Sequence, residues 1–422
     1  MFLLVKRGKI ELMDDATFPK IKESLVAVIP PDQSVIFGAM ALRLQKKQAA
    51  QKKRVFVAMS GGVDSSVAAA LLKKQGYDVT GVFINAWSLD MARDKQLSGR
   101  ISCMQQDDKR EAMRAAAHLG IPFLTFNFEK EYKKDVVDYM VQEYREGRTP
   151  NPDVMCNKHI KFGVFLKKAR EMGADYIATG HYARIATDPS GYTLLAGKDK
   201  NKDQSYFLWT LTQEQLRYTL FPIGDLLKPE VRELARKFGL PNAERKDSQG
   251  LCVVGEFPMK DFLKHFISEK RGDVLNEAGD IIGYHDGAFF FTLGQRHGFT
   301  VTKKKPNGPP QYIVAKDVVA NTITVAPMEA GETQGVRDVL LEQVNFISGI
   351  ILDIGREYQA RFRYRQPLQN VRIMNYESGI KKGAIPDSRF AIRFEEPQGA
   401  VASGQSLVLY DREECLGGGV LV

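Results

Sequence analysis

A short glycine- and serine-rich stretch, Ser60 to Ser66, has residue types and spacing that suggest chemistry. It reads SGGVDSS, follows the apolar run VFVAM and leads into the helix-like run SVAAALLKKQG. A loop that passes directly from a strand into a helix brings free backbone amides and the positive end of the helix dipole together, and this favours phosphate. Gly61 and Gly62 have no Cβ, so a ligand can approach the main chain closely. The stretch therefore predicts a phosphate-binding loop.

The residues around the two glycines restrict the type of phosphate site. The loop lacks the lysine of G-x-x-x-x-G-K-[ST] and does not fit G-x-G-x-x-G, so it is neither a Walker loop nor a dinucleotide fingerprint. Asp64 is unfavourable beside bound phosphates unless it holds Mg²⁺ or orients donors, and we assign it to Mg²⁺. Ser60, Ser65 and Ser66 add hydroxyl donors. A plain strand-to-helix turn does not require this combination of residues.

The four cysteines, Cys103, Cys156, Cys252 and Cys415, are too few and too scattered for a disulfide scaffold in a chain of 422 residues. The sequence has no Cys-x-x-Cys pair and no metal-ligand spacing among its six histidines, which argues against a closed zinc site. A cysteine with a special role is therefore expected to be reactive. The ordinary alternative for each is a buried apolar thiol.

Composition sets the broad class of the protein. The hydrophobic share of 44% and the charged share of 26% are typical of a globular protein, and the length predicts two or three domains. No apolar run approaches the roughly 20 residues that span a bilayer, so we expect a cytoplasmic protein without a membrane partner. The net charge of +9 suits a polyanionic partner.

The order of the strand and helix patterns predicts an α/β fold followed by two β-rich parts. From Arg54 onward strands alternate with helices, including the helix KPEVRELARKFGL and the strand DYIATGHYARI, which predicts a doubly wound parallel sheet with ligands at the carboxyl ends of its strands. After about Gly272 short strands broken by turn residues predict an all-β region, divided at EAGETQGV. The predicted domains are an N-terminal extension of unassigned role at 1–53, a catalytic domain at 54–258, a small β-rich central domain at 259–332 and a C-terminal β-barrel at 333–422.

Several motifs resemble those of one enzyme family. SGGVDSS is similar to the signature of the PP-loop ATP pyrophosphatases, which cleave ATP between its α and β phosphates to adenylate an oxygen. The stretches GRTPNPDVMCNKHIKFG, ATGHYAR, KDQSYFL, KDSQGLCVVGE, FTLGQRHG and RFRYRQ follow in the order seen in bacterial tRNA-specific 2-thiouridylases. The resemblance runs from about Arg54 to the C-terminus. It implies an adenine nucleotide α-hydrolase-like PP-loop domain and replacement of the 2-oxygen of the wobble uridine by sulfur in tRNAs for Lys, Glu and Gln. It also implies ATP and Mg²⁺, and a cysteine desulfurase or sulfur-relay protein as donor. We expect a monomer.

Two thiols fit this chemistry. A carbonyl oxygen must first become a leaving group, which AMP transfer achieves, and a persulfide and a second thiol then deliver the sulfur while a disulfide forms. By resemblance Cys252 carries the persulfide, Cys156 is the partner nucleophile and Asp153 is the acid/base. Both cysteines lie in polar, turn-rich segments, so we expect exposed thiols. Lys158 and Lys161 are placed to favour the thiolate of Cys156. The alternative is an iron–sulfur cluster held by Asp153, Cys156 and Cys252, although three protein ligands are few.

The resemblance also assigns binding residues. The predicted ATP-binding residues are Ala58, Met59, Ser60, Gly61, Gly62, Val63, Asp64, Ser65, Ser66, Gly180, His181, Gln204 and Ser205. The predicted tRNA-binding residues are Lys202, Asp203, Gln204, Arg296, Arg361, Arg363, Tyr364, Arg365 and Gln366. On a strand the three arginines of RFRYRQ would share one face, the ordinary alternative being a solvated edge strand. His181 is alternatively a core histidine, Cys103 is expected near the surface without a role, and Cys415 is expected to be inert.

Two other functional classes remain open at this stage. One is a PP-loop ligase or amidotransferase acting on a small molecule, which needs neither paired cysteines nor a basic barrel. The other is a catalytically inactive tRNA-binding module. The intact SGGVDSS loop together with both thiols favours the enzyme over the inactive module.

Overall fold

The computed structural model describes residues 2–6, 9–13, 52–87, 95–246, 259–302, 308–327, 335–377 and 389–422. Met1–Lys52 form one unit, in which β1 (Phe2–Lys6) and β2 (Lys9–Met13) pair as an antiparallel hairpin. Lys53–Val422 form a second unit, which contains every predicted site residue.

A five-stranded parallel sheet forms the centre of the first part of this unit. Its strands, in spatial order, are β5 (Phe123–Asn127), β4 (Asp78–Asn85), β3 (Arg54–Ala58), β6 (Tyr176–Ala178) and β9 (Thr219–Leu220). All neighbouring pairs are parallel. The chain leaves β3 toward β4 on one side and returns to β6 on the other, so the strand order reverses beside β3. A ligand site is expected at such a switch point, and the SGGVDSS loop follows β3 there.

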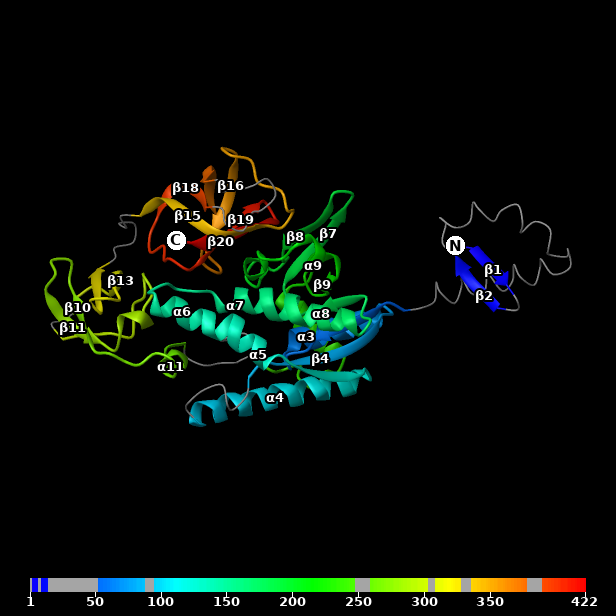
Figure 1. The fold of residues 1–422 in the computed structure, drawn as a ribbon. Helices are drawn as coiled ribbons and strands as arrows, with labels where there is room; N and C mark the ends of the chain where they lie inside the picture. The colour runs from blue at the N-terminus through cyan, green and yellow to red at the C-terminus, as the bar shows by residue number, and fades with distance from the viewer. Residues whose placement is uncertain are drawn as a thin grey trace. The chain divides into compact units, whose positions relative to one another are not determined.

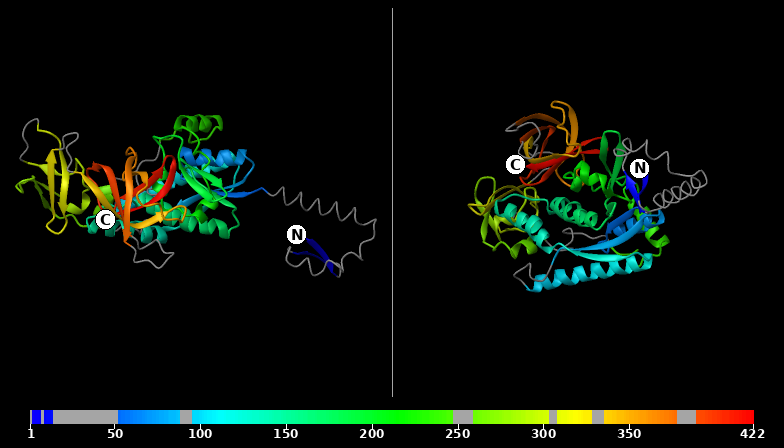
Figure 2. Two further views of the ribbon diagram at one scale, coloured as in Figure 1. Left: turned by 90° about the horizontal axis from the view of Figure 1, so that it is seen from above. Right: turned by 45° about the vertical axis from the view of Figure 1, so that its right-hand side comes forward.

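Helices cover both faces of the sheet (Figures 1 and 2). Successive side chains of β3 point to opposite faces, so each face carries apolar side chains for helices to pack against. Val55 and Val57 pack in one apolar cluster and Phe56 packs in another. The first face is covered by α3 (Val63–Lys74) and α4 (Lys95–Leu119). The second face is covered by α5 (Glu129–Tyr132), η3 (Lys133–Asp138), α6 (Tyr139–Arg145), α7 (Pro152–Met155), η4 (Cys156–Val164) and α8 (Phe165–Glu171). The predicted doubly wound α/β fold is confirmed.

The strand predicted for DYIATGHYARI is wrong as a single element. It divides into β6 of the parallel sheet and β7 (Ala183–Asp188), which pairs with β8 (Gly191–Ala196) in a different sheet. The break falls at Gly180, where the backbone passes so close to α3 that an added Cβ would lie 2.7 Å from the backbone N of Ser65. The remaining elements here are η5 (Ser205–Leu208), α9 (Gln213–Arg217) and α10 (Lys228–Lys237). Helix α10 has Pro229 in its first turn, and Gly239 follows it with φ +64°, as the sequence predicts.

A small mixed sheet makes up the central β-rich part. Helix α11 (Met259–Lys264) precedes it, and η6 (Ala288–Phe290) lies within it. Its strands, in spatial order, are β12 (Thr300–Val301), β11 (Ile281–His285), β10 (Gly272–Leu275), β14 (Thr322–Pro327) and β13 (Gln311–Asp317). Strands β10 and β14 are parallel, and the other neighbours are antiparallel.

The C-terminal part is a closed six-stranded barrel. Its strands are β15 (Val336–Phe346), β16 (Glu357–Arg361), β17 (Gln369–Glu377), β18 (Arg389–Gln398), β19 (Ser406–Asp411) and β20 (Glu414–Leu421). The pairing of β15 with β20 closes the ring. Strand β20 also pairs with β8, so the hairpin β7–β8 extends the barrel sheet from within the catalytic part. The predicted barrel is therefore present, and β7 and β8 of the catalytic part extend its sheet beyond the six barrel strands.

None of the helices in the described ranges combines the length and the apolar character that crossing a membrane requires.

Candidate active site

The SGGVDSS loop has a backbone shape that requires glycine at position 61. Gly61 has φ +80°, and a Cβ added to it would collide with the carbonyl oxygen of Asp108 in α4. Gly62 is the N-cap residue of α3 and has no side chain with which to cap the first turn. The first-turn N–H groups of a helix lack intrahelical partners, and the helix dipole is positive at this end, so the loop fits a phosphate group.

The serine hydroxyls serve the loop in different ways. Ser65 Oγ and Ser66 Oγ donate to the carbonyl oxygen of Gly62 at 3.2 and 3.0 Å, and Ser65 Oγ accepts from the N–H of Ser60. Both side chains are buried, whereas Ser60 is exposed. Ser65 and Ser66 therefore hold the loop in its shape, and Ser60 is the exposed hydroxyl of the three. The side chains of Met59 and Val63 are also buried, so these two residues offer only backbone groups to a ligand.

Asp64, predicted as a Mg²⁺ ligand, lies in an ion pair. Its carboxylate oxygens accept from Lys228 Nζ at 2.7 and 2.9 Å, and Oδ1 also accepts from the Tyr182 hydroxyl at 3.0 Å. No group of three or more His, Cys, Asp or Glu side chains in the described parts of the chain is placed to hold a metal ion. The assignment of Mg²⁺ to Asp64 stays a prediction, and such an ion would have to compete with Lys228.

Residues 179–181 lie between the loop and the segment that carries Cys156. On one side Gly180 packs against the backbone of Asp64 and Ser65. On the other side His181 Nε2 lies 3.4 Å from Lys161 Nζ of η4, and its ring lies 5.9 Å from that of Phe162. Because Lys161 can only donate, His181 Nε2 accepts, and Nδ1 is the donor toward Thr179 Oγ1 at 2.7 Å. The neutral tautomer of His181 is thus fixed from both ends.

The buried position of His181 predicts an acid-sensitive fold. Burial, with a smaller contribution from Lys161, holds the pKa of His181 well below its ordinary value. The unfolded imidazole titrates near its usual pKa of about 6.5, so below about pH 7 the unfolded state binds more protons and stability falls as pH falls. We expect the melting temperature to drop between pH 7.5 and 5.5 and His181→Asn to reduce that drop. Replacing the exposed His297 by Asn is the control. An unchanged pH dependence in His181→Asn would contradict this role.

Cys156 lies in the protein core rather than at the surface. The backbone N–H of Cys156 donates to the carbonyls of Pro152 and Asp153, and the Asn151 side chain accepts from Val154 N, so a helix begins just before the cysteine. This helix turns Cys156 inward, where its exposed fraction is 0%. The predicted exposed thiol is therefore wrong for this structure. Asp153 lies on the same turn and is half-buried.

Two lysines were predicted to favour the thiolate of Cys156. Both lie in η4 downstream of the cysteine. Burial lowers the pKa of Lys158. Lys161 is the cation beside His181. The structure therefore gives Lys161 a contact with the 179–181 segment, and the effect of either lysine on the thiol stays a prediction.

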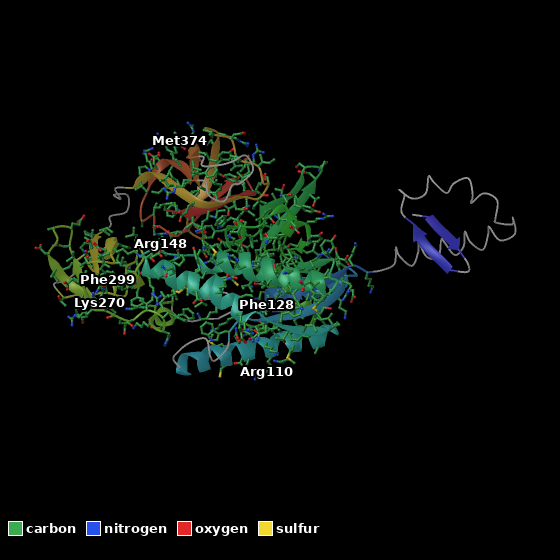
Figure 3. The ribbon with its side chains drawn as sticks, in the orientation of Figure 1. Arg110, Phe128, Arg148, Lys270, Phe299 and Met374 are labelled. Carbon is green, nitrogen blue, oxygen red and sulfur yellow. The ribbon has the colours of Figure 1, made fainter. Side chains whose placement is uncertain are left out.

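The chain just before Cys156 is held by both β-rich parts. An added Cβ on Gly147, which has φ +77°, would lie 2.9 Å from Val318 beyond β13. Thr149 donates its N–H to the carbonyl of Ser403 at 2.7 Å, and its hydroxyl lies 3.1 Å from that of Thr292. Arg148, labelled in Figure 3, binds Glu143 and Glu146 through its guanidinium. The segment leading to Cys156 is thus fixed where three parts of the protein meet.

Asp203 and Arg361 form a buried ion pair between the catalytic part and the barrel. Arg361 NH2 binds Asp203 Oδ2 and the Tyr410 hydroxyl, and the exposed fractions of the Arg361 and Asp203 side chains are 9% and 5%. Ser205 donates its N–H to Asp203 Oδ1 and its hydroxyl to Asp203 Oδ2, each at 3.0 Å. Asp203, Ser205 and Arg361 are all buried here, and their contacts with ATP or tRNA stay predictions. Gln204, between them, accepts from the N–H of Tyr182 at 3.0 Å.

The prediction that three arginines share one face of a strand is wrong. Strand β16 ends at Arg361, and the chain then turns, with φ +65° at Arg365. The side chain of Gln366 stabilises the turn, because its Oε1 accepts from the N–H groups of Phe362 and Arg363. Consequently Arg361 is buried and Arg365 is exposed.

The other predicted tRNA-binding side chains differ in exposure. Arg363 donates to the carbonyls of Leu293 and Ala400, and the Tyr364 ring lies 4.7 Å from that of Phe207. Arg296 is exposed, and Lys202 is half-buried. Arg296 and Arg365 are therefore the arginines of this set that a polyanion can reach most directly.

Comparison with known proteins relates this geometry to a family. The chain matches three domain families described as tRNA methyl transferase HUP domain (residues 53–256), tRNA methyl transferase PRC-barrel domain (260–327) and Aminomethyltransferase beta-barrel domain (336–421). It is 43% identical over 371 residues to the tRNA-specific 2-thiouridylase MnmA of Enterococcus faecalis, covering 88% of this chain and 95% of that protein. The chain belongs to the tRNA-specific 2-thiouridylase family. The MnmA proteins of Bacillus cytotoxicus (42% identity; 87% of this chain, 94% of that protein) and Streptococcus thermophilus (42%; 88% and 95%) are similar to the same extent.

Among solved structures, a 4-thiouridine synthetase in complex with RNA and bound ATP is similar to this chain at 21% identity and a TM-score of 0.26. The match covers 48% of this chain and 44% of that chain.

Of the remaining three cysteines, Cys103 and Cys415 lie among the described residues. Cys252 lies outside the described residues, so its distance from Cys156 and the iron–sulfur alternative are both untested. Cys103 is exposed on α4, as expected. Cys415 is buried in β20, and burial raises the pKa of its thiol to about 12, which agrees with an inert cysteine.

Two residues of this 2-thiouridylase, Asn242 and Arg245, contact the SGGVDSS loop but were not predicted from the sequence. Asn242 Nδ2 donates to the carbonyl of Gly61 at 2.8 Å and lies 3.0 Å from Ser66 Oγ. Arg245 donates to the carbonyl of Gly61 at 3.1 Å and forms an ion pair with Asp108. Asn242 and Arg245 follow Gly61 by 181 and 184 positions in the sequence. Their positions beyond α10 carry no local signal of such a contact.

Proposed function

We propose that this chain is a tRNA 2-thiouridylase that replaces the C2 oxygen of the wobble uridine with sulfur at the expense of ATP. Membership of the family supports the reaction. The observation that supports an active site here is the double contact of residues 179–181. Gly180 packs against the phosphate-type loop, and His181 contacts Lys161 of η4, the helix that begins at Cys156. This double contact supports a nucleotide site near the helical segment that begins at Cys156.

ATP is proposed to bind with its phosphates at the N-terminus of α3. Gly62, which has no side chain at the N-terminus of α3, and the first-turn amides fit this role. Transfer of AMP to the uridine oxygen makes that oxygen a leaving group, and pyrophosphate is released. The chain's part is to orient the phosphates, through a loop held rigid by Ser65, Ser66 and Asn242. Mg²⁺, if held at Asp64, supplies charge neutralisation for the phosphates.

Sulfur is proposed to arrive as a persulfide on Cys252. Its terminal sulfur attacks C2, AMP leaves, and a mixed disulfide joins Cys252 to the tRNA. The Cys156 thiolate then attacks the Cys252 sulfur, which leaves the delivered sulfur on the tRNA and forms a Cys156–Cys252 disulfide. A two-electron reductant restores the thiols. Because Cys156 is buried in this structure, its thiol has to become accessible before this step.

The proposed macromolecular partner is tRNA, with the Lys, Glu and Gln isoacceptors as the specific set. Arg296 and Arg365 are exposed, and the net charge is +9. A wobble base lies in a single-stranded loop and can be displaced into a site at low cost. A cysteine desulfurase or sulfur-relay protein as donor, a monomeric state and a cytoplasmic location remain predictions.

A coupled product assay tests this function. Unmodified tRNA for Glu, ATP, Mg²⁺ and a persulfide donor are expected to give 2-thiouridine and AMP in equal amounts. The matched control is the same tRNA with cytidine at the wobble position, which is expected to give neither product. Formation of ADP in place of AMP, or equal AMP release with the control tRNA, would contradict the proposal and favour small-molecule ligation or another use of ATP.

A further inference from the structure

The ion pair between Asp64 and Lys228 lies at the positive end of α3. Asp64 is the second residue of α3, and the exposed fractions of the Lys228 and Asp64 side chains are 13% and 30%. Lys228 Nζ lies 2.7 and 2.9 Å from the two carboxylate oxygens, so it binds both. The pair therefore lies in the helix terminus to which the proposed function assigns the ATP phosphates.

Both partners of Asp64 are fixed by contacts of their own. Lys228 begins α10, and its N–H donates to Asp199 Oδ2 at 2.9 Å. Tyr182 is 2% exposed and exchanges two hydrogen bonds with Gln204, one from its N–H to Oε1 at 3.0 Å and one from the Gln204 N–H to its carbonyl at 2.9 Å. The Tyr182 ring also lies 5.9 Å from Lys228 Nζ, within the range of a cation–π contact. The carboxylate is thus held by a prearranged cation and hydroxyl.

This arrangement resolves an electrostatic conflict in the loop. A carboxylate in the first turn of a helix interacts favourably with the helix dipole, but it repels a polyphosphate that binds at the same terminus. The loop contains no lysine of its own. We propose that Lys228 is a positioning residue for ATP binding: it neutralises Asp64 and, together with Tyr182, fixes the direction of the carboxylate. This inference rests on the proposed use of ATP.

A purely structural tie between α3 and α10 is the competing explanation. The two helices already share an apolar cluster that includes Val63, Val67, Val231 and Ala235. Apolar packing of this kind does not depend on the charged pair, so loss of the lysine charge is expected to leave the helices docked. The two explanations therefore differ in whether nucleotide affinity or stability changes.

A charge-rescue experiment separates them. Calorimetric titration with α,β-methylene ATP is compared for wild type, Lys228→Met and the double variant Lys228→Met with Asp64→Asn. An uncompensated charge beside phosphates predicts about 30- to 100-fold weaker binding in Lys228→Met. The titrations are made in Mg²⁺-free buffer, so that a role of Asp64 in holding that ion does not enter the comparison. The double variant, with neither charge, is then expected to bind more tightly than Lys228→Met, and Tyr182→Phe is expected to bind more weakly than wild type but more tightly than Lys228→Met. Melting temperatures of the variants provide the folding control.

The outcomes distinguish this inference from the proposed function. Unchanged affinity in Lys228→Met, or a double variant as weak as the single one, would overturn the inference while leaving the function intact. Failure of wild type to bind the analogue would contradict both the inference and the proposed use of ATP.

Discussion

Replacing Cys156 by serine is expected to lower the rate of tRNA thiolation at least about 1,000-fold, because a hydroxyl cannot take over the thiolate's attack on a disulfide sulfur. Serine is close in size to cysteine, so the buried position tolerates it sterically. The measurement is 2-thiouridine formed in a single turnover without added reductant. Cys103, exposed on α4, is the matched control, and Cys103→Ser is expected to stay within about twofold of wild type.

The same variant should also trap an intermediate. If Cys156 acts after the persulfide, the Cys156→Ser protein still adenylates the tRNA and forms the mixed disulfide between Cys252 and the tRNA. A covalent protein–tRNA adduct that dithiothreitol releases is therefore expected on denaturing gels. Full thiolation activity in this variant would exclude Cys156 from the chemistry. An inactive variant that forms no adduct would place Cys156 before the attack on C2.

The second large effect is expected at Arg361, where the substitution Arg361→Met should destabilise the protein by about 3–5 kcal/mol. It leaves the Asp203 carboxylate buried without its counter-ion, and an uncompensated buried charge costs this much. Urea unfolding monitored by fluorescence measures the change. Arg365→Met, at an exposed position four residues later, is the control and is expected to change stability by less than about 0.5 kcal/mol.

A double substitution tests the cause of this loss. Arg361→Met combined with Asp203→Asn removes both charges but keeps a side-chain oxygen that accepts from the N–H groups of Gly197 and Ser205, so it is expected to recover part of the lost stability. If the double variant is as unstable as the single one, the destabilisation comes from lost packing against Tyr410 rather than from the unpaired carboxylate.

The main architecture was predictable because it depends on local patterns. Alternating strands and helices indicated the doubly wound sheet, and two adjacent glycines before a helix indicated the phosphate-type loop at its switch point. Pro229 and Gly239 correctly marked the ends of α10. Each of these signals lies within one element or one turn, where sequence determines backbone shape directly.

The burial of the site residues was not predictable because it depends on tertiary contacts. The polar sequence around Cys156 suggested an exposed thiol, but the helix that begins after Asn151, with Pro152 as its first residue, turns this thiol into the core. RFRYRQ has the alternation of a strand, yet the side chain of Gln366 stabilises a turn there. Asp203 and Arg361 are 158 residues apart, and no local pattern shows that they pair.

The most direct test of the persulfide route is a single-turnover reaction of iron-free protein that carries a labelled persulfide on Cys252. With ATP and unmodified tRNA for Glu, we expect transfer of the label to the wobble uridine and one Cys156–Cys252 disulfide, detected by mass spectrometry, for each 2-thiouridine formed. Thiolation that appears only in anaerobic, iron-loaded protein, without that disulfide, would contradict the persulfide route and assign Asp153, Cys156 and Cys252 to a cluster.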